Sequence, residues 1–281
     1  MDPVRGLIVN ADDLGWSRSV NAGIIEAHLT GIVTSTSILA TGAAFSDAAA
    51  LALTTPSLDA GVHLSFYRGA TFLPPERVST LVGPDGQFLG SWRRIVGRLL
   101  AGTFDLGQLE AELRAQIAAV KAAGIAPTHV DGEKHLHLWP SIFDLVCRLA
   151  VESGIPQVRV VREPPGLHAI PLGLGVLSRR DAGVARRCGL VTPNATIGVT
   201  EPPRDLEAFA RILRGAHAPH VEFVVHPGHV DEEFMRIQRT VANRLVRSRE
   251  DELAVLTSPE AREMVERSGY SLVRRTDDVG Q

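Results

Sequence analysis

The sequence predicts an α/β protein, in its simplest form a distorted TIM-like (β/α) barrel that forms a single domain over residues 1–281. Stretches with strand-like composition alternate along the chain with stretches of helical periodicity, which is the pattern of a parallel β/α fold. Four short apolar runs also end in residues that can bind metal or transfer protons. Parallel β/α enzymes build their sites at the carboxyl ends of strands, so these endings indicate one shared site with loop excursions over it.

The composition fits one globular domain and excludes two classes of protein. A chain of 281 residues, 44% hydrophobic and 22% charged, can bury a full core. A net charge of −3 without long runs of one sign is not typical of a nucleic-acid binder. No stretch approaches the roughly 18 apolar residues that a membrane span requires.

The N-terminus and the cysteines predict a cytoplasmic protein. Residues 1–5 lack the apolar region of a signal peptide. Cys147 and Cys188 match no metal or redox spacing, and we interpret both as reduced thiols. An apolar helix face that packs between chains would allow a homodimer.

The first half of the chain predicts three strands with intervening helices and one long loop. Ser17 is placed to cap a helix with apolar positions at Val20 and Ile24, and Gly31 ends that helix. The connection from residue 65 to about 94 holds two proline turns and is long enough to be a functional loop. The strands are expected over 6–10, 32–40 and 58–66, and the helices over 17–28 and 43–53.

The second half continues the alternation. Residues 105–123 form the clearest helix, because leucines recur there at helical spacing. Residues 162–203 are rich in Gly, Pro and Arg, and we expect a partly helical lid or insertion over the barrel mouth. The remaining strands are expected over 128–131, 158–161, 196–200 and 221–225, and the remaining helices over 141–152, 205–215, near 250 and over 259–267, with a last segment over 270–274.

Asp12 and Asp13 are the sharpest pair of candidate catalytic residues. Adjacent carboxylates at a strand end repel each other, and a divalent cation is the usual partner that offsets this repulsion. One carboxylate could bind the metal while the other takes a proton from a metal-bound water. The alternative is a turn or a helix cap, since Asp-Asp-x-Gly suits both.

Two further strand ends carry candidate metal ligands. His63 follows an apolar run, where a histidine is otherwise a core residue with a satisfied hydrogen bond. Gly132 permits a sharp bend that aims Glu133, His135 and His137 into a common space. The alternative for this dense segment is a solvated loop.

The fourth strand end carries His226, and aromatic residues accompany the motifs. His226 could be the general acid that protonates a leaving amine, or a histidine that bonds only to the backbone. Trp16, Trp92 and Trp139 lie beside the motifs or in the long loop. Aromatic faces at a barrel mouth suit sugar rings, although packing of a lid would also explain them.

The order of these motifs resembles that of the YdjC-like carbohydrate deacetylases, which include chito-oligosaccharide deacetylases and hopanoid-biosynthesis-associated proteins. Residues 7–15 (LIVNADDLG) resemble the family signature N-A-D-D-F-G. Residues 61–64 (GVHL) resemble its G-x-H segment, and 127–137 (PTHVDGEKHLH) resemble P-T-H-x-D-S-H-x-H-x-H. Residues 226–228 resemble the late H-P segment and 253–259 the closing stretch, so the similarity spans nearly the whole chain.

The resemblance implies a distorted barrel and a divalent-metal hydrolase that removes an N-acetyl group from an amino sugar or a sugar-bearing metabolite. Carried over, Asp12 is the base, Asp13 and His63 are metal ligands, and His226 assists the leaving amine. The expected partner is thus a small N-acetylated sugar. Side chains beside the motifs are expected to contact this substrate: Trp16, Lys134, His135, His137, Trp139, Arg159 and Arg162.

One position departs from the family pattern. The family carries a histidine directly after Asp-Ser, and that histidine is expected to bind metal, whereas this chain has Gly132 followed by Glu133. A carboxylate can still bind metal, but it favours Mg²⁺ or Mn²⁺ over Zn²⁺. We therefore expect Asp13, His63 and Glu133 to hold a divalent metal, with Mg²⁺ preferred and Mn²⁺, Zn²⁺ or Co²⁺ as alternatives.

Two other functions stay open from the sequence. Loss of the metal through Glu133 would leave a saccharide-binding protein without activity. Another metal-dependent amidase or phosphoesterase is the second alternative. Few lysines lie near the motifs, which argues against a phosphate substrate, whereas Arg159 and Arg162 keep that option open.

Overall fold

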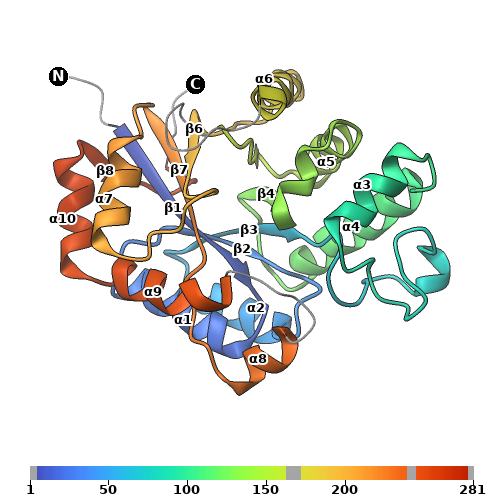
Figure 1. The fold of residues 1–281 in the computed structure, drawn as a ribbon, viewed down its shortest axis with the longest axis horizontal. Helices are drawn as coiled ribbons and strands as arrows, with labels where there is room; N and C mark the ends of the chain where they lie inside the picture. The colour runs from blue at the N-terminus through green and yellow to red at the C-terminus, as the bar shows by residue number, and fades with distance from the viewer. Residues whose placement is uncertain (1–4, 163–171, 239–244, 278–281) are drawn as a thin grey trace.

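The computed structural model describes residues 5–162, 172–238 and 245–277, and its centre is a curled sheet with helices on the outside (Figure 1). The strand order is β5-β4-β3-β2-β1-β7-β6, and β8 pairs with the start of β1. Every one of these strand pairs is parallel. The strands are β1 (Arg5–Leu14), β2 (Ser35–Ile38), β3 (Asp59–Leu64), β4 (His129–Gly132), β5 (Gln157–Val158), β6 (Ala195–Ile197), β7 (His220–Val225) and β8 (Tyr270–Leu272).

Hydrogen bonds connect the chain segments that contain the two outer strands of this sheet, β5 and β6. The amide of Thr196 in β6 donates to the carbonyl of Arg162, beyond the end of β5, at 2.9 Å. The Thr196 hydroxyl donates to the Val160 carbonyl at 3.0 Å, and the Val158 amide to the Val191 carbonyl at 3.0 Å. The curled sheet therefore returns on itself, as expected of the predicted distorted (β/α) barrel.

The helices cover the outer face of the sheet, as Figure 1 shows for α1, α4 and α7. Two predicted helix starts are confirmed: Ser17 accepts from the Val20 amide at 3.2 Å, and Asp105 accepts from the Gly107 amide at 2.7 Å. The helices are α1 (Arg18–Leu29), α2 (Phe45–Thr54), α3 (Trp92–Leu100), α4 (Leu106–Ala122), α5 (Pro140–Ser153), α6 (Leu172–Arg187), α7 (Leu206–Arg214), α8 (Glu232–Gln238), α9 (Leu245–Leu256) and α10 (Pro259–Arg267).

The structure of segment 162–203 differs in part from the lid or insertion over the barrel mouth that the sequence predicted. Its strand β6, which was expected over 196–200, is the end strand of the sheet beside β7, and α6 packs against α5. These parts of the segment belong to the barrel wall, because Ala195–Ile197 is buried and paired with the sheet. Residues 163–171 lie outside the described residues. Helices α3 and α8 were not predicted from the sequence.

Both cysteines are free thiols, of which Cys147 is buried and Cys188 is exposed. Burial raises the pKa of Cys147 to about 12, so this thiol is unreactive at neutral pH. Within the described part of the chain, every helix is too short or too polar to span a bilayer.

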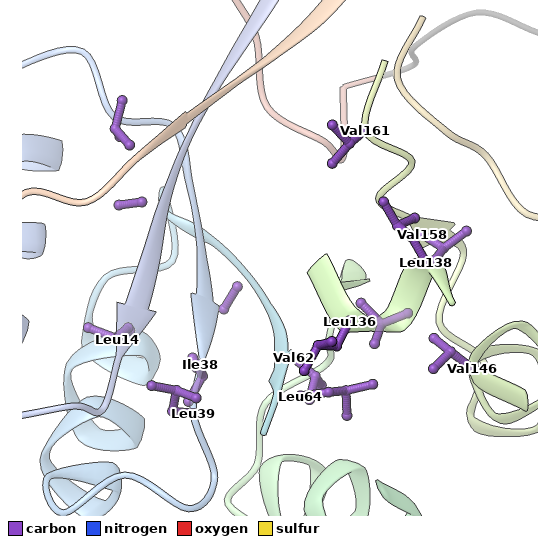
Figure 2. Close-up of a cluster of buried hydrophobic side chains, with 14 of the residues drawn as sticks. Leu14, Ile38, Leu39, Val62, Leu64, Leu136, Leu138, Val146, Val158 and Val161 are labelled. Atoms are coloured by element: carbon purple, nitrogen blue, oxygen red, sulfur yellow. The ribbon is translucent and has the colours of Figure 1, made fainter. Parts of the chain in front are cut away.

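The strands turn apolar side chains outward and polar side chains inward. In β1, Leu7 and Val9 belong to the apolar core under the helices, whereas Asn10 and Asp12 bond to Ser37 of β2 inside the barrel. This alternation follows from the two-residue period of a strand. Figure 2 shows part of the apolar layer, with labelled side chains Leu14, Ile38, Leu39, Val62, Leu64, Leu136, Leu138, Val146, Val158 and Val161.

A charged network fills the barrel interior. Arg159 donates from Nη1 and Nη2 to the two oxygens of Asp12 at 2.8 and 2.7 Å, and from Nε to Glu222 at 2.9 Å. Its Nη2 also lies 2.7 Å from Asp131, and Arg275 pairs with Glu222 from the other side. These side chains come from strands across the barrel, so the network fixes the relative positions of the strands beneath the site.

Candidate active site

A pocket of about 190 Å³ opens at the carboxyl ends of the strands. Its wall combines the ends of β1, β3 and β7 with the 3₁₀ segment η2 (Glu133–Leu138) after β4. The four strand endings singled out in the sequence thus meet in one pocket. The lining residues are Asp12, Asp13, His63, Arg68, Glu133, Lys134, His135, Val199 and His226.

Backbone strain is concentrated in this wall. Asp13, Lys134 and His135 have φ angles of 75°, 51° and 55°, and they are the non-glycine residues with positive φ in the described ranges. A left-handed conformation costs a non-glycine residue about 1–3 kcal/mol, and such residues cluster at functional sites. The fold therefore maintains these side-chain directions at a cost in stability.

Asp12 and His226 lie close to each other in the wall of the pocket. Burial opposes ionisation of Asp12, but the Arg159 guanidinium holds the pKa of this carboxyl below its usual range. His226 Nε2 lies 4.0 Å from Asp12 Oδ2. Burial lowers the pKa of His226 to about 4, so at neutral pH an ionised carboxylate faces a neutral imidazole.

Asp13 lies between two arginines. Arg249 of α9 donates to Oδ2, and Arg68 Nη2 lies 3.8 Å from Oδ1. Despite complete burial, these guanidinium groups hold the pKa of Asp13 well below its usual range. Asp13 Oδ1 also lies 3.7 Å from His63 Nε2, so an ionised carboxylate and an imidazole face each other in the pocket.

His63 is oriented from below by Asp131. The distance from His63 Nδ1 to Asp131 Oδ1 is 2.7 Å, and Asp131 Oδ2 accepts from Ser37 at 2.9 Å. Burial opposes protonation of the imidazole, but the Asp131 carboxylate raises the pKa of His63 to about 9. Such a carboxylate partner on one ring nitrogen leaves the other, Nε2, directed at Asp13 and the pocket.

The donor set suits a divalent metal, although the expected ligands are not all together. Asp12, His63 and Asp131 each offer a ligand atom within 4.8 Å of the others, a group that could hold a metal ion. In the expected set, Asp13 and His63 face each other, and a metal at Nε2 would displace the imidazole proton. Glu133 is directed elsewhere: Arg68 donates to its Oε1 at 2.5 Å and the Phe66 amide to its Oε2 at 3.2 Å.

The expected substrate contacts divide into two groups. Lys134 and His135 line the pocket. Arg159 is completely buried below the pocket, where its guanidinium donates hydrogen bonds to carboxylates. His137 is also buried, and its Nε2 lies 3.0 Å from the Arg159 carbonyl oxygen. Their strand and turn positions direct them inward and not to the mouth. The candidates that do not line the pocket are Trp16, His137, Trp139, Arg159 and Arg162.

Two arginines of the site were not predicted. Arg68 follows β3, the strand that contains His63. The sequence did contain a signal for it: Glu133 replaces a neutral histidine of the family pattern, and a buried carboxylate there needs a cation to neutralise it. Arg249 lies 236 residues from Asp13 in the chain, and no local pattern marks it.

The comparisons with known proteins agree on one family. The model of the YdjC-like protein family matches residues 6–267. A carbohydrate deacetylase of Brevibacillus brevis is 32% identical over 268 residues, which cover 95% of this chain and 97% of that protein. A human carbohydrate deacetylase is 35% identical over 249 residues, covering 81% of this chain and 76% of the human protein. A chitooligosaccharide deacetylase of Yersinia pestis is 32% identical over 272 residues, covering 95% and 96%.

A solved structure agrees with the fold. A protein of Enterococcus faecalis V583, described as a candidate cellobiose-phosphate cleavage protein, matches with a TM-score of 0.77 at 26% identity. The match covers 96% of this chain and 97% of that chain. The distorted barrel is therefore shared over the full length of both.

Proposed function

Because the chain belongs to the YdjC-like family, we propose that it hydrolyses the N-acetyl group of an amino sugar or a sugar-bearing metabolite, releasing acetate and a free amine. The observation that carries this proposal is the ionised Asp12 and neutral His226, 4.0 Å apart in the wall of the pocket. Hydrolysis of an amide needs one group to take a proton from water and one to give a proton to nitrogen. Relatives named as carbohydrate deacetylases support this reaction class.

The pocket suits the reacting end of a sugar. Its volume of about 190 Å³ is below the range of roughly 300–1,000 Å³ of pockets that enclose drug-sized ligands. It would therefore enclose the acetamido group and leave the remaining saccharide at the mouth, where Lys134 is exposed. The partner is a small N-acetylated sugar. The cytoplasmic location and the homodimer stay predictions.

The proton steps follow from the two side chains. Asp12, held in place by Arg159, takes a proton from the attacking water as the water oxygen bonds to the acetyl carbon. His226 protonates the nitrogen as the C–N bond breaks. Since burial keeps His226 neutral at neutral pH, it must first gain a proton, and Asp12 at 4.0 Å is placed to pass on the one taken from water.

A divalent metal, Mg²⁺ before Mn²⁺, Zn²⁺ or Co²⁺, is part of the proposal. Asp13 and His63 would hold it, and a bound ion would supply Lewis acidity for the attacking water and the acetyl carbonyl. Glu133 could join them as the third ligand only by leaving Arg68. Carboxylate ligands favour a hard ion such as Mg²⁺.

The first test is release of acetate from N,N′-diacetylchitobiose by protein stripped with a chelator, with and without each of the four metal ions. We expect acetate release that depends on added metal. Asp12→Asn should abolish measurable turnover while the affinity for the metal stays within about 3-fold of wild type, since Asp12 accepts a proton and is not an expected ligand. Retained turnover in this variant would contradict the assignment of the base.

One observation favours a second candidate, a saccharide-binding protein without activity. Glu133, expected as a ligand, is already neutralised by Arg68. This candidate predicts binding of diacetylchitobiose in calorimetry but no acetate with any of the four ions. Metal-dependent acetate release excludes it.

A further inference from the structure

Arg68 is a buried arginine in the pocket wall that is held on three sides. Only 7% of the residue is exposed. Its Nε donates to Glu133 Oε1 at 2.5 Å, its Nη2 lies 3.8 Å from Asp13 Oδ1, and its Cζ lies 4.1 Å from the ring centroid of Trp16. A guanidinium held in this way has one orientation and a fixed positive charge.

One nitrogen of this guanidinium group has no hydrogen-bond partner among the residues that the structure describes. This atom, Nη1, is buried, although Arg68 lines the pocket. A buried donor without a partner costs about 1–3 kcal/mol, and more when the group is charged. In the pocket wall, the other buried side-chain nitrogen of a described residue without a partner is His135 Nδ1. An oxygen of a bound ligand would satisfy Nη1.

We propose that Arg68 is a catalytic residue of the hydrolysis proposed above, on which this inference rests, and that its Nη1 donates a hydrogen bond to the oxygen of the acetyl group. As the water oxygen bonds to the acetyl carbon, the π electron pair of the carbonyl moves onto this oxygen, which becomes negatively charged. When the C–N bond breaks, the pair returns and the carbonyl of acetate forms, while the nitrogen receives its proton from His226. The fixed charge of Arg68 stabilises the intermediate more than the neutral substrate.

Glu133 is, in this account, the positioning residue of Arg68. Its second oxygen accepts from the Phe66 amide at 3.2 Å, so the carboxylate is anchored to the loop that carries Arg68. Gly132 lets the two segments approach, because a Cβ atom there would lie 2.5 Å from the Phe66 ring. A carboxylate at position 133 thus places a cation in the pocket.

The kinetic test compares Arg68→Met with Arg93→Met. Arg93 is the matched control because its guanidinium also lies over a tryptophan, with Cζ 5.4 Å from the Trp92 ring centroid, and it does not line the pocket. We expect Arg68→Met to lower kcat about 10²- to 10³-fold with KM changed less than about 3-fold, as for loss of an oxyanion donor. Arg93→Met should match wild type.

Arg68→Lys separates catalysis from folding, since it keeps the charge and removes the planar fork. It should give a kcat between those of wild type and Arg68→Met, with circular dichroism spectra that show all variants folded. A folded Arg68→Met protein with kcat within about 3-fold of wild type would overturn the proposal while leaving the deacetylase function intact.

A binding test keeps the two proposals distinguishable if wild type releases no acetate. Methylphosphonate carries a methyl group on a tetrahedral centre, as the intermediate does, with three oxygens in the places of the two oxygens and the nitrogen of that intermediate. Its binding to chelator-treated protein can be followed by ³¹P NMR. Binding to wild type and Arg93→Met but at least 10-fold weaker binding to Arg68→Met would support Arg68 as the oxygen-binding group although the proposed reaction fails. Equal binding to all three proteins, or binding to none, would overturn it.

Discussion

The barrel interior and the pocket above it both bury arginines beside carboxylates, but the nitrogens of the interior arginines Arg159 and Arg275 all have partners, whereas one nitrogen of the pocket arginine Arg68 has none among the described residues. Every side-chain nitrogen of Arg159 and of Arg275 donates to a partner inside the barrel. Arg68 keeps Nη1 without one, and the wall around it contains the strained residues Asp13 and His135. Buried charge by itself therefore marks no site in this protein. A buried cation that lines a pocket and has a donor without a partner does.

The largest effect is expected from breaking the interior network with Arg159→Met. This change leaves Asp12, Asp131 and Glu222 without their shared cation in a fully buried place. Removing one partner of a buried charge network costs about 3–5 kcal/mol. Urea unfolding should show a loss of at least that size.

The control for this prediction is Arg148→Met. Arg148 also pairs with a carboxylate through two nitrogens, but it lies on the surface. An exposed pair contributes less than about 1 kcal/mol. Equal losses in the two variants would mean that the interior network does not stabilise the barrel as described.

The next prediction concerns the pocket, where Glu133 pairs with Arg68. Glu133→His restores the residue of the family pattern but leaves Arg68 buried without its carboxylate, so we expect a loss of about 3 kcal/mol in urea unfolding and a lower kcat. Adding Arg68→Met should recover most of the stability and raise the affinity for Zn²⁺ in calorimetry, since the two residues are coupled. A gain of activity in Glu133→His alone would show that Glu133 is not needed to position Arg68 and that it is a decayed ligand.

The last effect, similar in size to the one at Glu133, is a pH dependence of stability that originates at His63, between the barrel interior and the pocket. His63 has a folded-state pKa raised to about 9 from an ordinary value of 6.5. Its pairing with Asp131 therefore stabilises the fold fully below about pH 6.5, and this contribution is lost as the pH rises to 9. In chelator-treated protein, the free energy of unfolding should fall over this range by an amount on the order of 3 kcal/mol.

His63→Gln serves as the reference for this pH dependence, because glutamine occupies a similar volume and does not titrate. Its free energy of unfolding should be nearly flat between pH 6.5 and 9. An equal slope in wild type and variant would assign the effect to another group.

Local sequence patterns predicted most of the fold. The alternation of strand and helix, the Ser17 cap and the start of a helix at residue 105 are short-range signals. They were right because the preferences of these residues act within one turn. The strand expected over 196–200 is Ala195–Ile197 in the structure, and its partner β7 follows more than 20 residues later in the chain. Arg159, expected at the substrate, faces the interior, because one residue along a strand changes the face.

By itself, the sequence determined which chemistry gathers at the strand ends, because a strand followed by Asp12 and Asp13, by His63 or by His226 carries its reactive group wherever the strand lies. Only the tertiary structure decided how each group is partnered. Arg249 reaches Asp13 across 236 residues and Arg68 reaches Glu133 across 65. Such ion pairs depend on how neighbouring strands, the loops after them and an outer helix are placed in space, which no local pattern contains.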